Sequence, residues 1–451
     1  MADMKTLKET LLSGGYDSVL KEVYLYDDCL AQQRKRYADV IDSFINLFGA
    51  DRIGGLYSAP GRTEIGGNHT DHNHGRVLAA GIDLDAIAVA SKNTDHTVRV
   101  KSEGYRMDVV DLSDLSVQEK ETGHSAALVR GVCARFQQLG YRIGGFDATT
   151  ASRVPAKIQE LGHKVGGFDA WATSSVLSGS GLSSSAAYEV LVGNIVNHFF
   201  CEGALTPIQI AKIGQYAENV YFGKPCGLLD QMASSVSGFV MIDFKDPSAP
   251  VIEKVDFDFA SCGHSLCIVD TGGNHSDLTE EYAAVRGEME AVAAEFQKPV
   301  LREVEEETFR QGIPTLRNRV GDRAILRALH FYCENKRVIE EVEALRSGDF
   351  ETFKEKVIES GQSSFMYNQN VYTPRLPKEQ PIALALQLTE QMLRGKGAWR
   401  VHGGGFAGTI QAFVPNDCLA EYQAEMERIF GVNTCYVLSV RPVGGVQIAE
   451  E

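Results

Sequence analysis

Residues 179–187 read GSGLSSSAA and lead directly into an apolar-periodic stretch, and this string limits the possible folds of the chain more than any other feature. Glycines at 179 and 181 let the backbone wrap closely around a ligand. The serines open the first turn of a predicted helix, where unpaired N–H groups and the helix dipole favour an anion such as a phosphate. A Gly/Ser run before a helix is also typical of a plain turn and N-cap, so the interpretation depends on the other motifs.

Composition places the chain among ordinary globular proteins and excludes some partners. With 451 residues, 44% hydrophobic and 23% charged, it is long enough for two or three domains. A formal net charge of -16 argues against a nucleic-acid or anionic-membrane partner, because both require basic patches. The N-terminus has no apolar signal-peptide core, and the apolar stretch Val77 to Ala90 is broken by Asp83 and Asp85. Nine cysteines without a CxxC pair indicate reduced thiols, so we expect a cytoplasmic protein with no membrane segment and no obligatory protein partner.

The first half of the chain mixes helical and strand patterns. Apolar residues recur at helical spacing from Leu30 to Phe48, which predicts an amphipathic helix. Leu78 to Ser91 alternates in part, and residues 96–112 are typical of two short strands around a glycine turn. These patterns predict an antiparallel, mixed α+β domain.

The second half repeats this mixture. Phe239 to Phe244 and Ser265 to Asp270 are predicted strands, and the latter opens a second domain. Residues 320–360 are predicted to be helical, with charge runs that indicate a solvated surface. A second glycine-rich turn, VHGGGFAGT, precedes the strand-like TIQAFVP.

One segment is duplicated. QQLGYRIGGFDA at 137–148 returns as QELGHKVGGFDA at 159–170, displaced by 22 residues. A single short offset does not indicate a solenoid, which needs several stacked units. We interpret about 149–170 as a local duplication inserted as a surface excursion; a duplicated ligand site is the alternative.

The segment AENVYFGKPCGLLDQ, residues 217–231, delivers acidic groups from an irregular stretch. Glu218 falls in a helical run, which Gly223, Pro225 and Gly227 break before Asp230 enters a new helix. A carboxylate held in this way can act as a general base or bind a metal. Taken alone, Asp230 also fits an N-cap.

Residues 61–75, GRTEIGGNHTDHNHG, are dense in polar groups. One interpretation is a metal site, since imidazole and carboxylate suit Zn²⁺ and would serve a binuclear hydrolase. The other is a sugar or phosphate site, which the two glycine-rich loops favour. His72 and His74 are interpreted as exposed or structural.

Taken together, these motifs resemble those of galactokinases, members of a small-molecule kinase superfamily that includes homoserine, mevalonate and phosphomevalonate kinases. PGRTEIGGNHTD, GSGLSSSAA and GGGFAG occur in order, with PCGLLDQ, HSDLTEEYAAVR and ENKRV between them. The match runs from about Phe44 to the C-terminus and is broken mainly by the repeat. It implies a two-domain α+β kinase with its active site in the inter-domain cleft. The implied parts are an N-terminal extension (1–30), an N-terminal kinase domain (31–258) and a C-terminal kinase domain (259–451).

The resemblance also implies roles for individual residues. Asp230 matches the catalytic base and Arg62 the cation beside it, while Ser185 and Glu218 match the Mg²⁺ ligands. The ATP loop corresponds to Gly179, Ser180, Gly181, Leu182, Ser183, Ser184 and Ser185. The positions that contact the sugar correspond to Asn68, His69, Thr70, Asp71, Gly227 and Tyr282.

The first motif departs from the family's usual GRVNLIGEHTDY. Glu64 stands where Asn is expected, and Asn68 stands where the sugar-binding Glu is expected. The two positions lie four residues apart, so we expect Glu64 to share a partner with Asn68 and to supply the carboxylate that Asn68 lacks. The alternative is that Glu64 points into the domain and supports packing.

The resemblance therefore implies transfer of the γ-phosphate of ATP to the C1 hydroxyl of galactose, with Mg²⁺ and without a covalent enzyme intermediate. The alternatives are a kinase for a related sugar, such as N-acetylgalactosamine or a uronic acid, and a galactose- and ATP-binding regulator without turnover. A His-metal hydrolase is the third.

Overall fold

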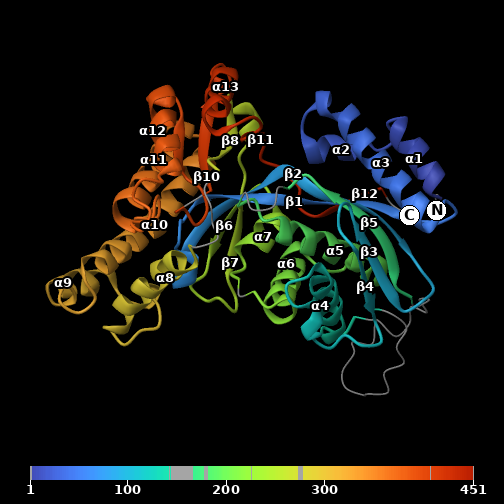
Figure 1. The fold of residues 1–451 in the computed structure, drawn as a ribbon, viewed down its shortest axis with the longest axis horizontal. Coiled ribbons are helices and arrows are strands. Elements are labelled where there is room, and N and C mark those ends of the chain that lie inside the picture. Colours follow the sequence, from blue (N-terminus) through green and yellow to red (C-terminus); the bar gives the residue numbers. More distant parts are fainter. Residues whose placement is uncertain are drawn as a thin grey trace.

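The computed structural model of the chain describes residues 3–141, 143, 166–176, 181–224, 226–272, 278–406 and 408–449, and these form two β-sheets with helices packed around them (Figure 1). The larger sheet has the order β12-β1-β2-β5-β3-β4, and β6 and β7 branch from β2. Its strands are β1 (Gly55–Gly66), β2 (Arg76–Lys92), β3 (Thr97–Ser102), β4 (Met107–Asp111), β5 (Phe168–Ser174), β6 (Phe239–Asp243), β7 (Val251–Val255) and β12 (Val446–Ala449). The mixed α+β architecture predicted from the sequence is confirmed, but the sheet is not purely antiparallel, because β3 and β5 pair in parallel.

The β1–β2 pair carries the first polar motif. The strands are antiparallel, and their register shifts between Pro60 and Arg62 and again between Glu64 and Gly66. Such irregularities bend a strand and re-aim its side chains. They lie at the residues that the sequence predicts to be functional.

The N-terminal helices cover one face of the larger sheet (Figure 1). They are α1 (Met4–Leu12), α2 (Asp17–Tyr24) and α3 (Leu30–Phe48), and the last confirms the predicted helix. They pack onto Ile87 and Val89 of β2, whereas Ala86 and Ala88 join the core on the opposite face. This is the alternation expected of a strand buried on both sides. The sequence indicated no function for residues 1–30, and the described part of this segment, residues 3–30, contributes to the core.

The opposite face of the sheet holds the helices that carry the ATP loop and the acidic segment. They are α4 (Ser125–Gln138), α5 (Ser184–Cys201), α6 (Pro207–Tyr216), a π-helix (Ala217–Phe222) and α7 (Leu229–Val236). A capping box at Thr206 begins α6. The π-helix continues directly from α6, and such turns often occur at functional sites.

The smaller sheet has the strand order β11-β8-β10-β9. Its strands are β8 (His264–Asp270), β9 (Ala398–Val401), β10 (Thr409–Pro415) and β11 (Cys435–Leu438). The helices of this half are α8 (Thr279–Ala294), α9 (Glu306–Leu316), α10 (Asp322–Ser347), α11 (Phe350–Ser363), α12 (Pro381–Leu393) and α13 (Leu419–Phe430). The last strand, β12, returns to the larger sheet and pairs with β1. The domain boundary near residue 258 stays a prediction.

The interpretation of the charge runs on residues 320–360 as a solvated surface is wrong for part of α10. Glu334 and Glu341 are fully buried, and Arg337 pairs with Glu334. Helical periodicity shows which residues share a face, but the packing of a helix against its neighbours, here the larger sheet and α11, decides which face is covered.

The duplicated segment lies only partly within the described residues. Residues 144–165 are outside them. The end of the predicted excursion is not on the surface, because Phe168 and Ala170 are buried in β5 and pair with β2. The second GGFDA copy thus begins a sheet strand.

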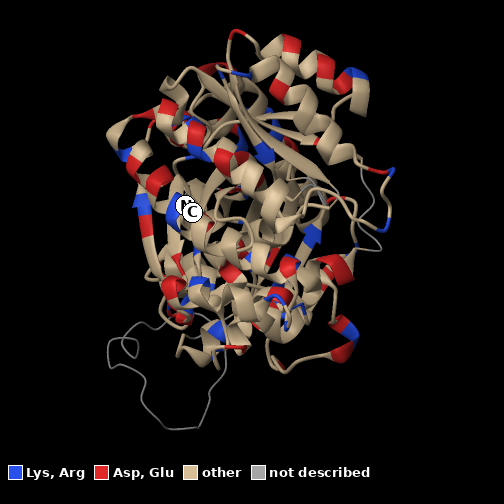
Figure 2. Cartoon of the chain, turned by 90° about the vertical axis from the view of Figure 1, so that its left-hand side faces the viewer, with Lys and Arg blue, Asp and Glu red and all other residues tan. Residues whose placement is uncertain are grey.

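Surface and cysteine chemistry match the composition. All nine cysteines are free thiols. Acidic and basic residues are interspersed along the helices in Figure 2, with exposed pairs such as Arg286–Glu290. Within the described part of the chain, no helix combines the length and the apolar character needed to cross a bilayer.

Candidate active site

Arg62 and Asp230 form an ion pair between β1 and the first turn of α7. Arg62 Nε donates to Asp230 Oδ1 at 2.8 Å, and Ser183 Oγ donates to Asp230 Oδ2 at 2.6 Å. Burial alone would raise the pKa of Asp230, but Arg62 and Ser183 outweigh it and lower that pKa. The side chain of Asp230 keeps 36% of its surface exposed. An ionised carboxylate that solvent can reach is therefore held in place by a cation and a hydroxyl.

The predicted ATP loop meets this pair at its helix-proximal end. Gly181 has a φ of 73° and its carbonyl accepts from Arg62, while Leu182 O accepts from the Arg62 N–H at 3.1 Å. Ser183 precedes α5 in a left-handed conformation, with a φ of 58°, and Ser184 is the first residue of the helix. Gly179 and Ser180 lie outside the described residues. The loop and the Arg62–Asp230 pair are thus hydrogen-bonded directly.

Glu218 and Ser185 are brought together from the π-helix and α5. Ser185 Oγ lies 3.4 Å from Glu218 Oε1, and Glu218 is almost fully buried. The other oxygen, Oε2, accepts from Gln231 Nε2 at 2.7 Å, and the same amide donates to Glu189 at 2.9 Å. Burial and the charge of Glu218 raise the pKa of Glu189 well above its usual range. Gln231 therefore orients Glu218 so that Oε1 faces Ser185.

Glu64 and Asn68 are hydrogen-bonded to each other, and the expectation that Glu64 supplies the carboxylate missing at position 68 stays a prediction. Asn68 Nδ2 donates to Glu64 Oε1 at 2.9 Å and to Gly403 O at 2.7 Å. Buried Arg400 also donates to Glu64 Oε1, at 2.8 Å. The ion pair with buried Arg400 is what the alternative of Glu64 as a packing residue describes. The hydrogen bond to Asn68 also keeps the Glu64 carboxylate next to position 68.

Protein groups occupy all four hydrogen-bonding positions of the Asn68 side-chain amide. Its Oδ1 accepts from Ser364 Oγ at 3.2 Å and from Asn370 Nδ2 at 2.9 Å, in addition to the two bonds that Nδ2 donates. A primary amide offers two donor and two acceptor positions. In this arrangement Asn68 has no hydrogen bond left for a substrate, which conflicts with the sugar contact that the resemblance implied.

The other predicted sugar-binding residues of the motif differ in their contacts: Thr70 and His69 are hydrogen-bonded to backbone carbonyls, and Asp71 lies beside Gly227. Thr70 is buried and its hydroxyl donates to Gly67 O at 2.8 Å, so it holds the loop. His69 has a φ of 57°, and its Nε2 donates to Gly404 O at 2.9 Å. Burial first, and then the charge of Glu64, raise the pKa of Asp71. A methyl group added at Gly227 would lie 3.2 Å from Asp71 Oδ2, so these two predicted positions are neighbours.

Tyr282 of α8 reaches the same place through the glycine-rich turn between β9 and β10. Its hydroxyl donates to Gly405 O at 2.9 Å. A methyl group added at Gly404 would lie 2.6 Å from the Tyr282 ring, so the ring requires glycine there. The turn thus links Tyr282 to His69.

Several supporting residues were not found from the sequence. On α10, Glu334 accepts from the Gly67 N–H at 3.2 Å, and His330 Nε2 donates to Asn68 O at 2.9 Å. Asn335 accepts from the Arg76 N–H at 2.8 Å. The segment ENKRV was noted only as part of the resemblance, and its charge pattern alone does not show that it anchors the first motif.

His402, in the second glycine-rich turn, was also missed. Its Nε2 lies 3.1 Å from Thr63 Oγ1 and its Nδ1 lies 2.9 Å from Thr409 Oγ1. Burial and then the charge of Arg62 lower the pKa of His402 to about 3. A neutral imidazole thus connects the smaller sheet to β1 beside the catalytic pair.

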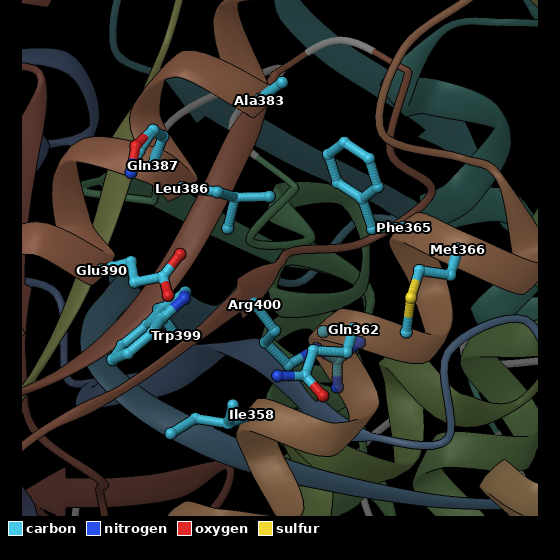
Figure 3. Close-up of a pocket in the computed structure, with 11 residues that line it drawn as sticks. Ile358, Gln362, Phe365, Met366, Ala383, Leu386, Gln387, Glu390, Trp399 and Arg400 are labelled. Carbon is cyan, nitrogen blue, oxygen red and sulfur yellow. The ribbon is translucent and has the colours of Figure 1, made fainter. Parts of the chain in front are cut away.

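A cavity of about 430 Å³ lies outside the site described above, since neither Arg62 nor Asp230 lines it (Figure 3). It is lined by α11, α12, β9 and the π-helix Ser364–Asn368 that follows α11. Arg400 and Trp399 form part of its wall. Since Arg400 also binds Glu64, this cavity and the Glu64–Asn68 pair are separated by one side chain.

The histidine-rich tract does not form the metal site that was considered from the sequence. His69 Nε2 is used by Gly404 O, and His72 lies with Nε2 3.4 Å from His69 Nδ1. No group of three or more His, Cys, Asp or Glu side chains among the described residues is arranged to hold a metal ion.

Comparison with known proteins finds two family models that match parts of the chain. Residues 42–92 match the galactokinase galactose-binding signature, and residues 127–238 match the GHMP kinases N terminal domain. Galactokinase from Lactococcus lactis, solved in complex with galactose, is 22% identical with a TM-score of 0.72, covering 92% of this chain and 100% of that one.

Two further solved structures share the fold at lower identity. Mevalonate kinase from Methanococcus jannaschii is 14% identical with a TM-score of 0.58, covering 86% of this chain and 98% of that one. Phosphomevalonate kinase from Streptococcus pneumoniae is 11% identical with a TM-score of 0.54, covering 88% and 99%. The family models thus match two parts of the chain, residues 42–92 and residues 127–238, and the fold of the chain is shared with the galactokinase and with these two kinases.

Proposed function

We propose that the protein transfers the γ-phosphate of ATP to the C1 hydroxyl of galactose. The observation that carries this proposal is the cluster of Arg62, Asp230 and Ser183 beside Glu218 and Ser185, in a chain with the galactose-binding signature. Phosphoryl transfer depends mostly on positioning and on neutralising charge, and this cluster offers both.

Asp230 serves as the general base. Its lowered pKa keeps it ionised at neutral pH, and its exposed side allows a sugar hydroxyl to approach. It accepts the proton of the C1 hydroxyl while that oxygen attacks the phosphoryl group. Arg62 holds the carboxylate and offsets negative charge that develops on the phosphoryl oxygens.

The loop from Gly179 to Ser185 and the start of α5 bind the phosphates of ATP, since a helix N-terminus presents free N–H groups to anions. Ser185 Oγ and Glu218 Oε1 are oxygen donors 3.4 Å apart and fit Mg²⁺, which prefers oxygen ligands and keeps several waters. When bound, Mg²⁺ supplies positive charge to the phosphate chain. Gln231 keeps Glu218 oriented for this purpose.

Glu64, His69, Asp71, Gly227 and Tyr282 form the sugar side of the site in this proposal. Asn68 and Thr70 hold the loop that presents them, in place of the direct sugar contacts implied by the resemblance. Glu64 retains one carboxylate next to residue 68. A buried polar group left unpaired by the wrong sugar costs about 1 to 3 kcal/mol, which provides discrimination between epimers.

The decisive experiment incubates the purified enzyme with ATP and Mg²⁺ and identifies the product by ³¹P and ¹H NMR. Galactose is compared with glucose, N-acetylgalactosamine and galacturonic acid at equal concentrations. We expect galactose 1-phosphate and the highest kcat/KM for galactose. A higher kcat/KM for another sugar would support the related-sugar kinase, and binding of galactose and ATP without product would support the regulator.

A further inference from the structure

Lys224 directly follows the π-helix that carries Glu218. Gly223 ends that helix with a φ of 83°, a left-handed conformation that glycine adopts at little cost. The N–H groups of Gly223 and Lys224 both donate to Glu218 O, at 3.1 and 3.2 Å. The backbone therefore fixes residue 224 beside Glu218.

The side chain of Lys224 meets the oxygen of Glu218 that faces the open site. Its Nζ donates to Glu218 Oε1 at 3.2 Å, while Gln231 holds Oε2 from the interior. Ser185 Oγ approaches the same Oε1. The ammonium group thus sits at the oxygen that a divalent cation would use.

The exposure of the two partners differs strongly. The side chain of Lys224 is 62% exposed, whereas that of Glu218 is 3% exposed. An exposed ion pair is held weakly, because water competes for the ammonium group and the long side chain gains freedom on leaving. Lys224 can therefore exchange partners, and Glu218 cannot move with it.

The negative charges of the protein and of ATP repel each other, so a cation such as Lys224 would favour nucleotide binding. The chain carries a net charge of -16, and ATP is itself anionic. Arg62 is 12% exposed and is already bound to Asp230 and Gly181 O. The side chain of Lys224 is the more exposed one, so an ammonium group that solvent can reach lies beside Glu218 Oε1.

We propose that Lys224 is a phosphate-binding residue that alternates between two partners. Without nucleotide it neutralises Glu218 Oε1. When ATP and the divalent cation bind, it leaves that oxygen to the metal and pairs with a phosphate oxygen of ATP. This inference rests on the proposed ATP site but not on the identity of the sugar.

The test compares Lys224→Met and Lys224→Arg with the wild-type enzyme. Calorimetry measures the affinity for ATP without metal and for ADP with Mg²⁺. We expect Lys224→Met to weaken both about tenfold, the scale of one charge-assisted contact, and Lys224→Arg to stay within about threefold. Lys21→Met is the matched control, since Lys21 forms an exposed ion pair with Asp27 at 2.8 Å far from the site in sequence.

A second measurement separates this role from that of a simple surface ion pair. Electron paramagnetic resonance follows binding of Mn²⁺ to the nucleotide-free protein, where Lys224 and the metal compete for Glu218. We expect Lys224→Met to bind Mn²⁺ more tightly, opposite in sign to its loss of nucleotide affinity. Unchanged nucleotide affinity, or a loss of both affinities, would overturn the proposal. If the wild type binds ATP but phosphorylates no galactose, the proposed function fails while this test still reports on Lys224.

Discussion

Exchanging the two unusual residues of the first motif tests how the sugar side of the site is built. Asn68→Asp keeps the size of the side chain but replaces Nδ2, which donates to Glu64 Oε1 at 2.9 Å and to Gly403 O at 2.7 Å, by an oxygen. Gly403 O loses the donor of this hydrogen bond, and Glu64 Oε1 keeps only Arg400, at a cost of about 1 to 3 kcal/mol in all. A second carboxylate also lies next to the first, and the two cannot both ionise easily.

We therefore expect Asn68→Asp to lower the stability of the protein by about 2 to 3 kcal/mol at neutral pH, seen as a fall in the thermal midpoint of roughly 5 to 10 °C. Glu64→Gln should cost a similar amount, because it leaves the fully buried Arg400 without its carboxylate. The remaining bonds from Arg400 to backbone carbonyls limit that loss.

Each single variant should also lower kcat/KM for galactose. The double variant Glu64→Gln/Asn68→Asp should recover at least half of that loss in kcat/KM. The amide introduced at position 64 can donate to the carboxylate introduced at position 68, and one negative charge remains near Arg400. We expect a coupling energy of about 1 to 2 kcal/mol in kcat/KM for galactose, and at least about 0.5 kcal/mol.

The matched control for this cycle is Asn197→Asp. Asn197 is buried on α5, and its amide donates to Leu205 O at 3.2 Å and accepts from the Leu205 N–H at 3.0 Å, with no carboxylate partner. Its effect should add to that of Glu64→Gln. If Glu64→Gln and Asn68→Asp were equally additive, the idea of a shared charge would be refuted. Loss of stability with unchanged kcat/KM would assign Glu64 to packing alone.

Four further results are expected. Asp230→Asn should lower kcat by at least about a hundredfold while ATP and galactose affinities stay within a few fold, and near-normal turnover would remove Asp230 from the mechanism. Glu218→Gln should raise the Mg²⁺ concentration for half-maximal rate, whereas a fall in galactose affinity with an unchanged Mg²⁺ requirement would contradict its assignment. Burial raises the pKa of Asp83 from 3.8 to about 6, so its ionisation destabilises the fold as pH rises from about 4 to about 6. Asp83→Asn should therefore raise the free energy of unfolding in urea by about 1 to 2 kcal/mol at pH 7.5 and by almost nothing at pH 4. An equal gain at both pH values would exclude this cause. Deleting residues 149–170 lets the first GGFDA copy take the place of the second at the start of β5. The shortened enzyme should fold and retain activity. Loss of ATP affinity in a deletion variant that still folds would instead assign the segment a function.

The sequence by itself determined the local structure and the candidate chemistry. Periodic apolar spacing predicted the helix Leu30–Phe48, and the short apolar run at Ser265–Asp270 predicted a strand, because both patterns arise from contacts between residues close in the chain. The glycine and serine string indicated a turn before a helix for the same reason. The order of the motifs was sufficient to indicate a resemblance to galactokinases.

Only the tertiary structure decided which groups support that chemistry. Glu334 lies in the charge runs that were predicted to be a solvated surface, and no role was predicted for Arg400. Both are buried against the first motif from more than 250 positions away. Lys224 and Gln231 acquire a role only because the π-helix places Glu218 between them. Contacts of this kind depend on how helices and sheets meet, and the hydrogen-bonding partners of a side chain are not encoded in its own neighbourhood of the sequence.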